Sequence, residues 1–274
     1  MNYKNDLTNF AAIILESFDI DKAETMSDSD KNLVSKITDK GKLDKALLFH
    51  ADAVPAYIIN KYPEIFENVR KHTNIEAEFK SVMPSITPVC FGAMFSGAYP
   101  ENNGIPKYAK PILSDTLVQP SLCVKTLVDL LTENGLKVAL VTCSDGCIAS
   151  MLHNRGADAY IIPGDDDELM FSKAYSLLES DEYDVIMLYQ LSYDYKMHAN
   201  GPESEIALTV LNKITDRFSE ICEKAKEVWK DKNYLTVFNS DHGCHLVYKE
   251  DKAKGSHGND IKEDMDLIWF FGVN

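Results

Sequence analysis

The chain has 274 residues, of which 45% are apolar and 26% charged, and its formal net charge is −15. This composition is typical of a globular protein whose core is large enough for one large domain or two small ones. The acidic excess argues against a nucleic-acid polymer or an anionic membrane as partner, because the attraction to their phosphate groups is missing.

The cysteines, the first residues and the lengths of the apolar runs indicate the cellular compartment. Six cysteines are scattered through the chain, and the closest pair, Cys143 and Cys147, lacks the CxxC spacing. We expect them to be reduced thiols. The first residues lack the basic-then-apolar layout of a signal peptide, and no apolar run is long enough to span a membrane. We therefore expect a cytoplasmic protein, and the sequence leaves its oligomeric state open.

The N-terminal quarter predicts a helix, a polar stretch and a buried strand. Residues 7–19 have the apolar spacing of an amphipathic helix, and the polar residues 21–44 are partly helical. We treat 1–44 as an N-terminal helical extension. Residues 45–51 form a continuous apolar run that predicts a buried strand ending at Asp52, and a helix is expected from Val54.

Strand and helix patterns alternate along the rest of the chain. The further predicted strands are 77–82, 136–142, 159–162, 184–190, 234–239 and 267–272. The further predicted helices are 88–98, 121–134, 146–154, 164–180 with an acidic first turn, and 203–230. No hairpin signal, repeat or linker interrupts this order. We expect an α/β fold with a mostly parallel central sheet, helices on both faces, one domain over 1–274 and no large cap domain.

Metal-ligand residue types follow several of the predicted strands. In open α/β sheets, ligands bind beyond the carboxyl ends of the strands. The candidates at such ends are Asp52, Asp194, His198, Asp241 and His242, with His257 on the loop before the last strand. Aspartate oxygens and histidine nitrogens without thiolates suit zinc or manganese. Six ligands exceed the need of one tetrahedral ion, so we predict two divalent ions, zinc first and manganese second, roughly 3.5–4 Å apart.

Thr87 is the predicted nucleophile beside these ions. It precedes Pro88, which suits the first position of a helix, so Thr87 is expected to be the N-cap at the positive end of the helix dipole. We expect a phosphate group to bind at this helix start against free backbone N–H groups. A metal ion lowers the pKa of a hydroxyl that it contacts. The expected partner is therefore a small phosphorylated substrate.

Together, five ordered segments carry a family resemblance. They are Ala51-Asp52, Met83-Pro-Ser-Ile-Thr87 followed by Gly97-Ala-Tyr-Pro-Glu-Asn-Asn-Gly104, Asp194-x-x-x-His198-x-x-Gly201-Pro202, Ser240-Asp-His-Gly243 and Gly255-Ser-His-Gly258. This set resembles the alkaline phosphatase superfamily, and most closely its type I phosphodiesterase/nucleotide pyrophosphatase branch. Each segment alone has an ordinary structural explanation, such as a turn, a helix cap or a solvated helix pair.

The resemblance implies a metal-dependent phosphoesterase that uses a threonine nucleophile. One ion would be held by Asp194, His198 and His257. The other would be held by Asp52, Asp241 and His242, with Thr87 as attacking group and additional ligand. The family implies a covalent phosphothreonine intermediate, and the expected activity is phosphodiesterase or nucleotide pyrophosphatase.

The chain also departs from the family, and other functions remain open. Tyr108 stands where related proteins often place a phosphate-binding asparagine. The alternatives are a sulfate-ester, phosphonate or phosphomonoester hydrolase, or a non-catalytic binder that retained metal and phosphate ligands. His245 is either a substrate contact or a surface residue, and the acidic run 165–168 is interpreted as the charged start of a helix.

Overall fold

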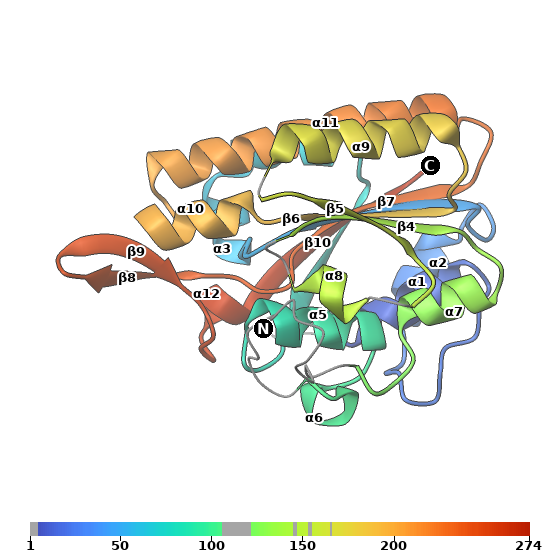
Figure 1. Ribbon diagram of the computed structural model, residues 1–274, viewed down its shortest axis with the longest axis horizontal. Coiled ribbons are helices and arrows are strands. Elements are labelled where there is room, and N and C mark those ends of the chain that lie inside the picture. Colours follow the sequence, from blue (N-terminus) through green and yellow to red (C-terminus); the bar gives the residue numbers. More distant parts are fainter. Residues whose placement is uncertain (1–4, 106–121, 145–146, 153–154, 165) are drawn as a thin grey trace.

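The computed structural model describes residues 5–105, 122–144, 147–152, 155–164 and 166–274. Its centre is an eight-stranded sheet in the order β1-β3-β10-β7-β2-β6-β4-β5 (Figure 1). The strands are β1 (Asn5–Asp6), β2 (Lys45–Ala51), β3 (Ile75–Lys80), β4 (Val138–Cys143), β5 (Asp158–Ile162), β6 (Val185–Gln190), β7 (Tyr234–Asn239) and β10 (Asp266–Val273). Within this sheet only β10 runs antiparallel to its neighbours, β3 and β7. The predicted mostly parallel α/β fold is confirmed.

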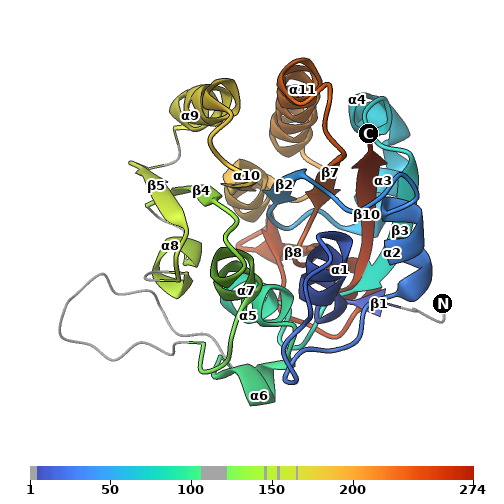
Figure 2. The same ribbon diagram turned by 90° about the vertical axis from the view of Figure 1, so that its right-hand side faces the viewer.

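Helices cover both faces of the sheet (Figure 2). One face carries α4 (Glu67–Arg70), α9 (Asp167–Ser180) and α11 (Glu205–Val228). The other carries α1 (Asn9–Ser17), α2 (Lys31–Ile37), α5 (Thr87–Ser96), α7 (Leu127–Glu133) and α8 (Ile148–Met151). Shorter elements are α3 (Ala56–Lys61), η1 (Pro63–Phe66), α6 (Pro100–Asn103), α10 (Ser192–Asn200) and α12 (Lys262–Met265). Among the described residues, no helix is both long and apolar enough to cross a bilayer.

The helix sequences explain this layering. α11 buries one stripe at three- and four-residue spacing, which includes Leu211, Phe218 and Ile221, and leaves its other side in water. Ser204 caps its start by accepting a hydrogen bond from the Ala207 backbone. By contrast, α5 is buried all round. α1, within the segment treated as an extension, is also almost wholly buried and packs against α2, α5 and α7.

Aromatic rings fill the core on both faces of the central strands. Phe49 of β2 stacks on Phe238 of β7 with ring centroids 5.5 Å apart. Phe218 of α11 meets Phe49 edge-on at 5.5 Å. On the opposite face, the His50 ring makes edge-on contacts with the rings of Phe10, Phe91 and Phe95. These contacts hold β2 and β7 rigidly beneath the loops that follow them.

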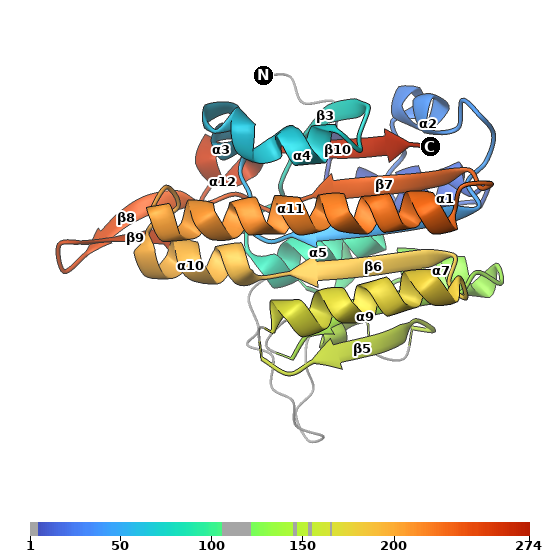
Figure 3. The same cartoon turned by 90° about the horizontal axis from the view of Figure 1, so that it is seen from above.

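One hairpin contradicts the expectation that the chain contains none. β8 (His245–Lys249) and β9 (Lys252–Ser256) pair antiparallel and project beyond the body of the molecule (Figure 3). Glu250 and Asp251 form the turn with φ of 51° and 58°. Such a turn normally uses Asn-Gly or Asp-Gly, so Glu-Asp gave no signal in the sequence.

The parallel central strands determine where the site lies. β2 pairs with β6 on one side and β7 on the other, with His50 opposite both Tyr189 and Asn239. All three strands therefore end at the same edge of the sheet. The segments that follow them begin at Asp52, at α10 and at Ser240.

Candidate metal centre

The first cluster of ligand types is Asp52, Asp241 and His242, which we call the inner triad. Asp52 follows β2, and the other two follow β7. His242 Nε2 lies 3.4 Å from an oxygen of Asp52 and 3.4 Å from an oxygen of Asp241. One ligand atom from each residue lies within 4.8 Å of the others, and all three side chains are buried.

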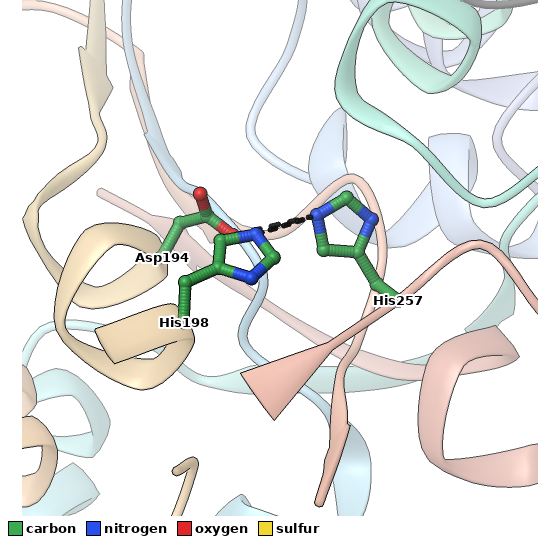
Figure 4. Close-up of side chains that lie close together, drawn as sticks. All are labelled: Asp194, His198 and His257. Carbon is green, nitrogen blue, oxygen red and sulfur yellow. Dashed lines mark hydrogen bonds and ion pairs between the residues drawn. The ribbon is translucent and has the colours of Figure 1, made fainter. Parts of the chain in front are cut away.

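The second cluster is Asp194, His198 and His257, which we call the outer triad (Figure 4). Asp194 and His198 lie one turn apart on α10, and His257 follows β9. Asp194 Oδ1 is 3.3 Å from His198 Nε2 and 3.6 Å from His257 Nε2. Unlike the inner triad, this cluster reaches the surface, because His198 is exposed.

Gly255 explains how β9 comes so close to α10. A Cβ atom at this position would lie 2.3 Å from Met197 Sδ and 2.6 Å from the Met197 carbonyl oxygen. Only glycine allows this approach, which places His257 beside Asp194 and His198.

The two triads are neighbours, and Thr87 lies at the inner one. The rings of His242 and His257 stack with centroids 4.1 Å apart. Thr87 Oγ1 is 3.1 Å from His242 Nε2 and 3.3 Å from Asp52 Oδ2. The structure therefore brings together all the site residues proposed from the sequence.

The hydrogen bonds of the histidines favour metal ligation. The Nδ1 atoms of His198, His242 and His257 lie 2.9, 2.9 and 3.0 Å from backbone carbonyl oxygens. A carbonyl can only accept, so each Nδ1 carries a proton, and in the neutral form of each ring Nε2 presents a lone pair. His198 Nε2 and His257 Nε2 then face each other at 3.1 Å. Two lone pairs repel at that distance, and a cation between them removes the repulsion.

The carboxylates point to the same conclusion. Asp52 Oδ1, Asp194 Oδ1 and Asp241 Oδ2 are buried, and none of them has a hydrogen-bond partner among the described residues. Buried polar atoms are almost always paired, so three unpaired anionic oxygens in one place indicate a missing positive partner. The residues present fit two divalent ions, one in each triad.

The electrostatics of the inner triad depend on that positive charge. Burial, followed by the charge of Asp194, raises the pKa of Asp241 to about 8. Burial, and then the charge of Asp241, raises the pKa of Asp52 well above its usual value. Burial lowers the pKa of His242. Without a cation the triad therefore favours protonated carboxyl groups, and a divalent ion reverses this preference.

Supporting residues hold the ligands, and the sequence reasoning missed the two most important. The Tyr189 hydroxyl donates to Asp52 Oδ2. The buried Asp264 carboxylate accepts hydrogen bonds from the Asn259 backbone at 2.9 Å and from His245 Nδ1 at 2.7 Å. His245, which was left open, thus braces the loop that follows His257. Tyr189 lies within the continuous buried run of β6, which predicts only a strand residue, and no motif marks Asp264.

The start of α5 differs from the prediction. Thr87 is the first helical residue, and Ile86 is the N-cap. Pro88 has no N–H, and the Val89 and Cys90 N–H groups both donate to the Ile86 carbonyl at 3.0 Å. The N–H groups of Val89 and Cys90 therefore already have an acceptor within the turn. The expectation that this helix start offers free N–H groups to a phosphate is wrong for these two residues.

Two other expectations concern residues away from the triads. Tyr108, at the position of the missing asparagine, lies outside the described residues. In the acidic run, Asp166 is the N-cap of α9 and accepts a hydrogen bond from the Leu169 backbone at 3.0 Å. Asp167 holds Ser192 at the start of α10 by hydrogen bonds of 2.9 Å. The predicted helix-start role of this run is confirmed for the described residues.

Several solved structures share the fold of this chain. Mouse ectonucleotide pyrophosphatase/phosphodiesterase 5, as an inactive threonine-to-alanine variant with AMP, gives a TM-score of 0.64 at 12% identity, covering 83% of this chain and 87% of that one. Phosphonoacetate hydrolase from Sinorhizobium meliloti with phosphonoformate gives 0.58 at 14% identity, covering 76% and 58%. The periplasmic domain of phosphoethanolamine transferase from Campylobacter jejuni gives 0.57 at 18% identity, covering 85% and 80%.

At these identities the structural neighbours show the fold alone. No curated protein sequence matches the chain. The sequence model of the type I phosphodiesterase/nucleotide pyrophosphatase family, in contrast, matches residues 46–267. This match covers most of the chain, which therefore belongs to that family of phosphoester hydrolases within the alkaline phosphatase superfamily.

Proposed function

We propose that the chain hydrolyses phosphodiester bonds in small phosphorylated substrates, with Thr87 as nucleophile and one divalent ion in each triad. Zinc is the first choice for both ions and manganese the second, because the ligands are oxygen and imidazole nitrogen without thiolate. The observation that carries the proposal is the placement of Thr87 Oγ1 within 3.3 Å of two inner-triad ligands.

The charge balance of the site suits an anionic substrate. The chain as a whole carries −15, and the triads add three carboxylates at the reaction centre. Two bound divalent ions outweigh those carboxylates, attract a phosphate group and lower the pKa of a nearby hydroxyl. This local positive field lets an acidic protein bind an acidic substrate.

The residues of the chain position the nucleophile and its proton. Thr87 stands at the start of the buried α5, so its hydroxyl is held in one place relative to Asp52 and His242. Attack forms a bond between Thr87 Oγ1 and phosphorus as the hydroxyl loses its proton, and the bond to the leaving alcohol breaks as that alcohol takes up a proton. Water then cleaves the phosphothreonine and restores the hydroxyl, which releases the phosphate monoester product.

Two structural neighbours support the threonine role and the substrate class. The threonine-to-alanine form of the mouse protein is described as inactive and holds AMP. Phosphonoacetate hydrolase holds phosphonoformate. Both ligands are small molecules with a phosphoryl or phosphonyl group, which is the class we propose here.

The test is a panel of matched aryl esters assayed with added Zn²⁺ or Mn²⁺. The panel contains a phosphate diester, a phosphate monoester, a phosphonate and a sulfate. We expect the diester to be hydrolysed fastest. Faster turnover of the sulfate or phosphonate would move the function to that alternative, and no turnover of any ester would leave the non-catalytic binder.

Variants of Thr87 identify the nucleophile. Thr87→Ala should lose at least about a thousandfold in kcat, because the attacking group is gone, whereas Thr87→Ser should keep measurable turnover. Thr132→Ala is the matched control, since among the described residues the Thr132 hydroxyl bonds only to the backbone carbonyls of Val128, Asp129 and Arg155. Equal turnover in wild type and Thr87→Ala would refute the threonine mechanism.

A further inference from the structure

Tyr189 touches the inner triad without belonging to it. Its side chain lies on β6, directly beside β2, and is fully buried. The ring packs edge-on against Phe91 of α5, with centroids 4.8 Å apart. Because Phe91 sits one turn after Thr87 on that helix, the tyrosine ring is fixed between the sheet and the nucleophile helix.

The Tyr189 hydroxyl bonds to one of the two Asp52 carboxylate oxygens and leaves the other unpaired among the described residues. Asp52 Oδ2 accepts the Tyr189 hydroxyl and lies near Thr87 Oγ1. Asp52 Oδ1 has no hydrogen-bond partner in the part of the chain that the structure describes, and it faces His242 Nε2 at 3.4 Å. The Asp52 backbone N–H also donates to the Gln190 carbonyl at 2.9 Å. Both the main chain and the side chain of Asp52 are therefore tied to β6, and only Oδ1 is left for a cation.

We propose that Tyr189 is a positioning residue that holds Asp52 as a one-oxygen ligand and so sets the affinity of the inner-triad ion. This inference rests on the proposed two-ion function. The outer triad is held by other contacts, from Gly255 to His198 and from Ser85 to His257. Loss of the tyrosine hydroxyl should therefore weaken one ion and spare the other.

The expected size follows from known metal sites. Removing a group that orients a first ligand typically costs 10- to 100-fold in metal affinity. Without the hydroxyl, the Asp52 carboxylate can rotate about its side-chain torsion, and Oδ2 competes with Oδ1 for the ion. A shift within about this range in one of two sites is measurable by direct titration.

Tyr189→Phe is the test variant, because it keeps the ring and its packing on Phe91. Tyr183→Phe is the matched control. The Tyr183 side chain is also buried, and its hydroxyl donates to the Asp158 carboxylate at 2.8 Å, outside both triads. Each variant removes one tyrosine hydroxyl from an aspartate. In Tyr183→Phe the Tyr160 hydroxyl, 2.7 Å away, also loses its partner, and it too lies outside both triads.

Mn²⁺ alone is titrated into metal-free full-length protein, and free and bound Mn²⁺ are followed by electron paramagnetic resonance. Wild type and Tyr183→Phe should bind two Mn²⁺ per chain and show the spectrum of a coupled pair. Tyr189→Phe should bind one Mn²⁺ as tightly as wild type and the second about 10- to 100-fold more weakly, with the coupled spectrum appearing only at high Mn²⁺.

Other outcomes overturn the inference in distinguishable ways. Two ions bound to Tyr189→Phe with wild-type affinity would show that the hydroxyl does not orient Asp52. Equal weakening of both ions would show a general structural role. A wild-type protein that binds fewer than two Mn²⁺ would refute the two-ion function itself and, with it, the role of Tyr189.

Discussion

Raising the pH of the metal-free protein from 6.5 to 8 should destabilise it. In the folded chain the pKa of Asp241 is raised to about 8 from an ordinary value of 3.8. Between these values the folded state holds a proton that the unfolded chain has released, so the free energy of unfolding falls as the pH rises. The pKa values of Asp52 and His198 are also raised, so both groups act in the same direction.

The loss of stability is expected only above about pH 6.5, because two buried histidines make stability rise with pH below that value. Burial lowers the pKa of His242, and lowers that of His50 to about 4. Below the ordinary histidine pKa, the unfolded chain protonates both residues while the folded chain keeps them neutral. The free energy of unfolding therefore rises with pH in that range. Between pH 6.5 and 8, the titration of Asp241 alone lowers the free energy of unfolding by about 2 kcal/mol, which lowers Tm by about 4–8 °C.

Thermal unfolding at pH 6.5 and 8 tests this, with chelator and with excess Mn²⁺. We expect the chelated protein to lose stability across the window and the Mn²⁺-loaded protein to change little. Asp241→Asn carries no titrating carboxyl at that position and should reduce the pH dependence of the chelated protein, which keeps the contributions of Asp52 and His198. A chelated wild type that unfolds at the same temperature at both pH values would contradict the electrostatic reasoning.

Three further predictions concern the scaffold. Gly255→Ala should cost at least about 2 kcal/mol and weaken Mn²⁺ binding at the outer triad, because its Cβ would lie 2.6 Å from the Met197 carbonyl oxygen; unchanged Mn²⁺ titration would contradict this. Asp264→Asn should weaken only the outer ion, since it frees the backbone of Asn259, and equal loss of both ions would count against it. Phe49→Ala should lower the free energy of unfolding in urea by about 3–5 kcal/mol, and a loss below about 1 kcal/mol would show that the core is not packed as described.

The sequence was informative where local patterns decide the structure. Continuous apolar runs identified the central strands β2, β6 and β7, because strands buried on both faces need no polar side. The candidate metal ligands could be proposed because they follow those strands and belong to short motifs. Parallel strands end at one edge, so order along the chain was enough to predict that Asp52, Asp194 and Asp241 meet.

The missed features depend on tertiary contacts that leave no local pattern. The hairpin turn at Glu250 and Asp251 uses residues that rarely adopt positive φ, and packing of β9 against α10 holds the hairpin in place. In the sequence, Tyr189 is only a residue of a predicted strand. Its contact with Asp52 depends on the pairing of β6 with β2, which no local pattern shows. The position of Thr87 within α5 differs by one residue from the prediction, which is the usual uncertainty of a helix boundary.

Anomalous diffraction from a crystal loaded with Mn²⁺ tests the central claim most directly. We expect two peaks roughly 3.5–4 Å apart, one bounded by Asp52, Asp241 and His242 and the other by Asp194, His198 and His257, with the Thr87 hydroxyl at the first. No peak, or peaks away from these side chains, would contradict the account.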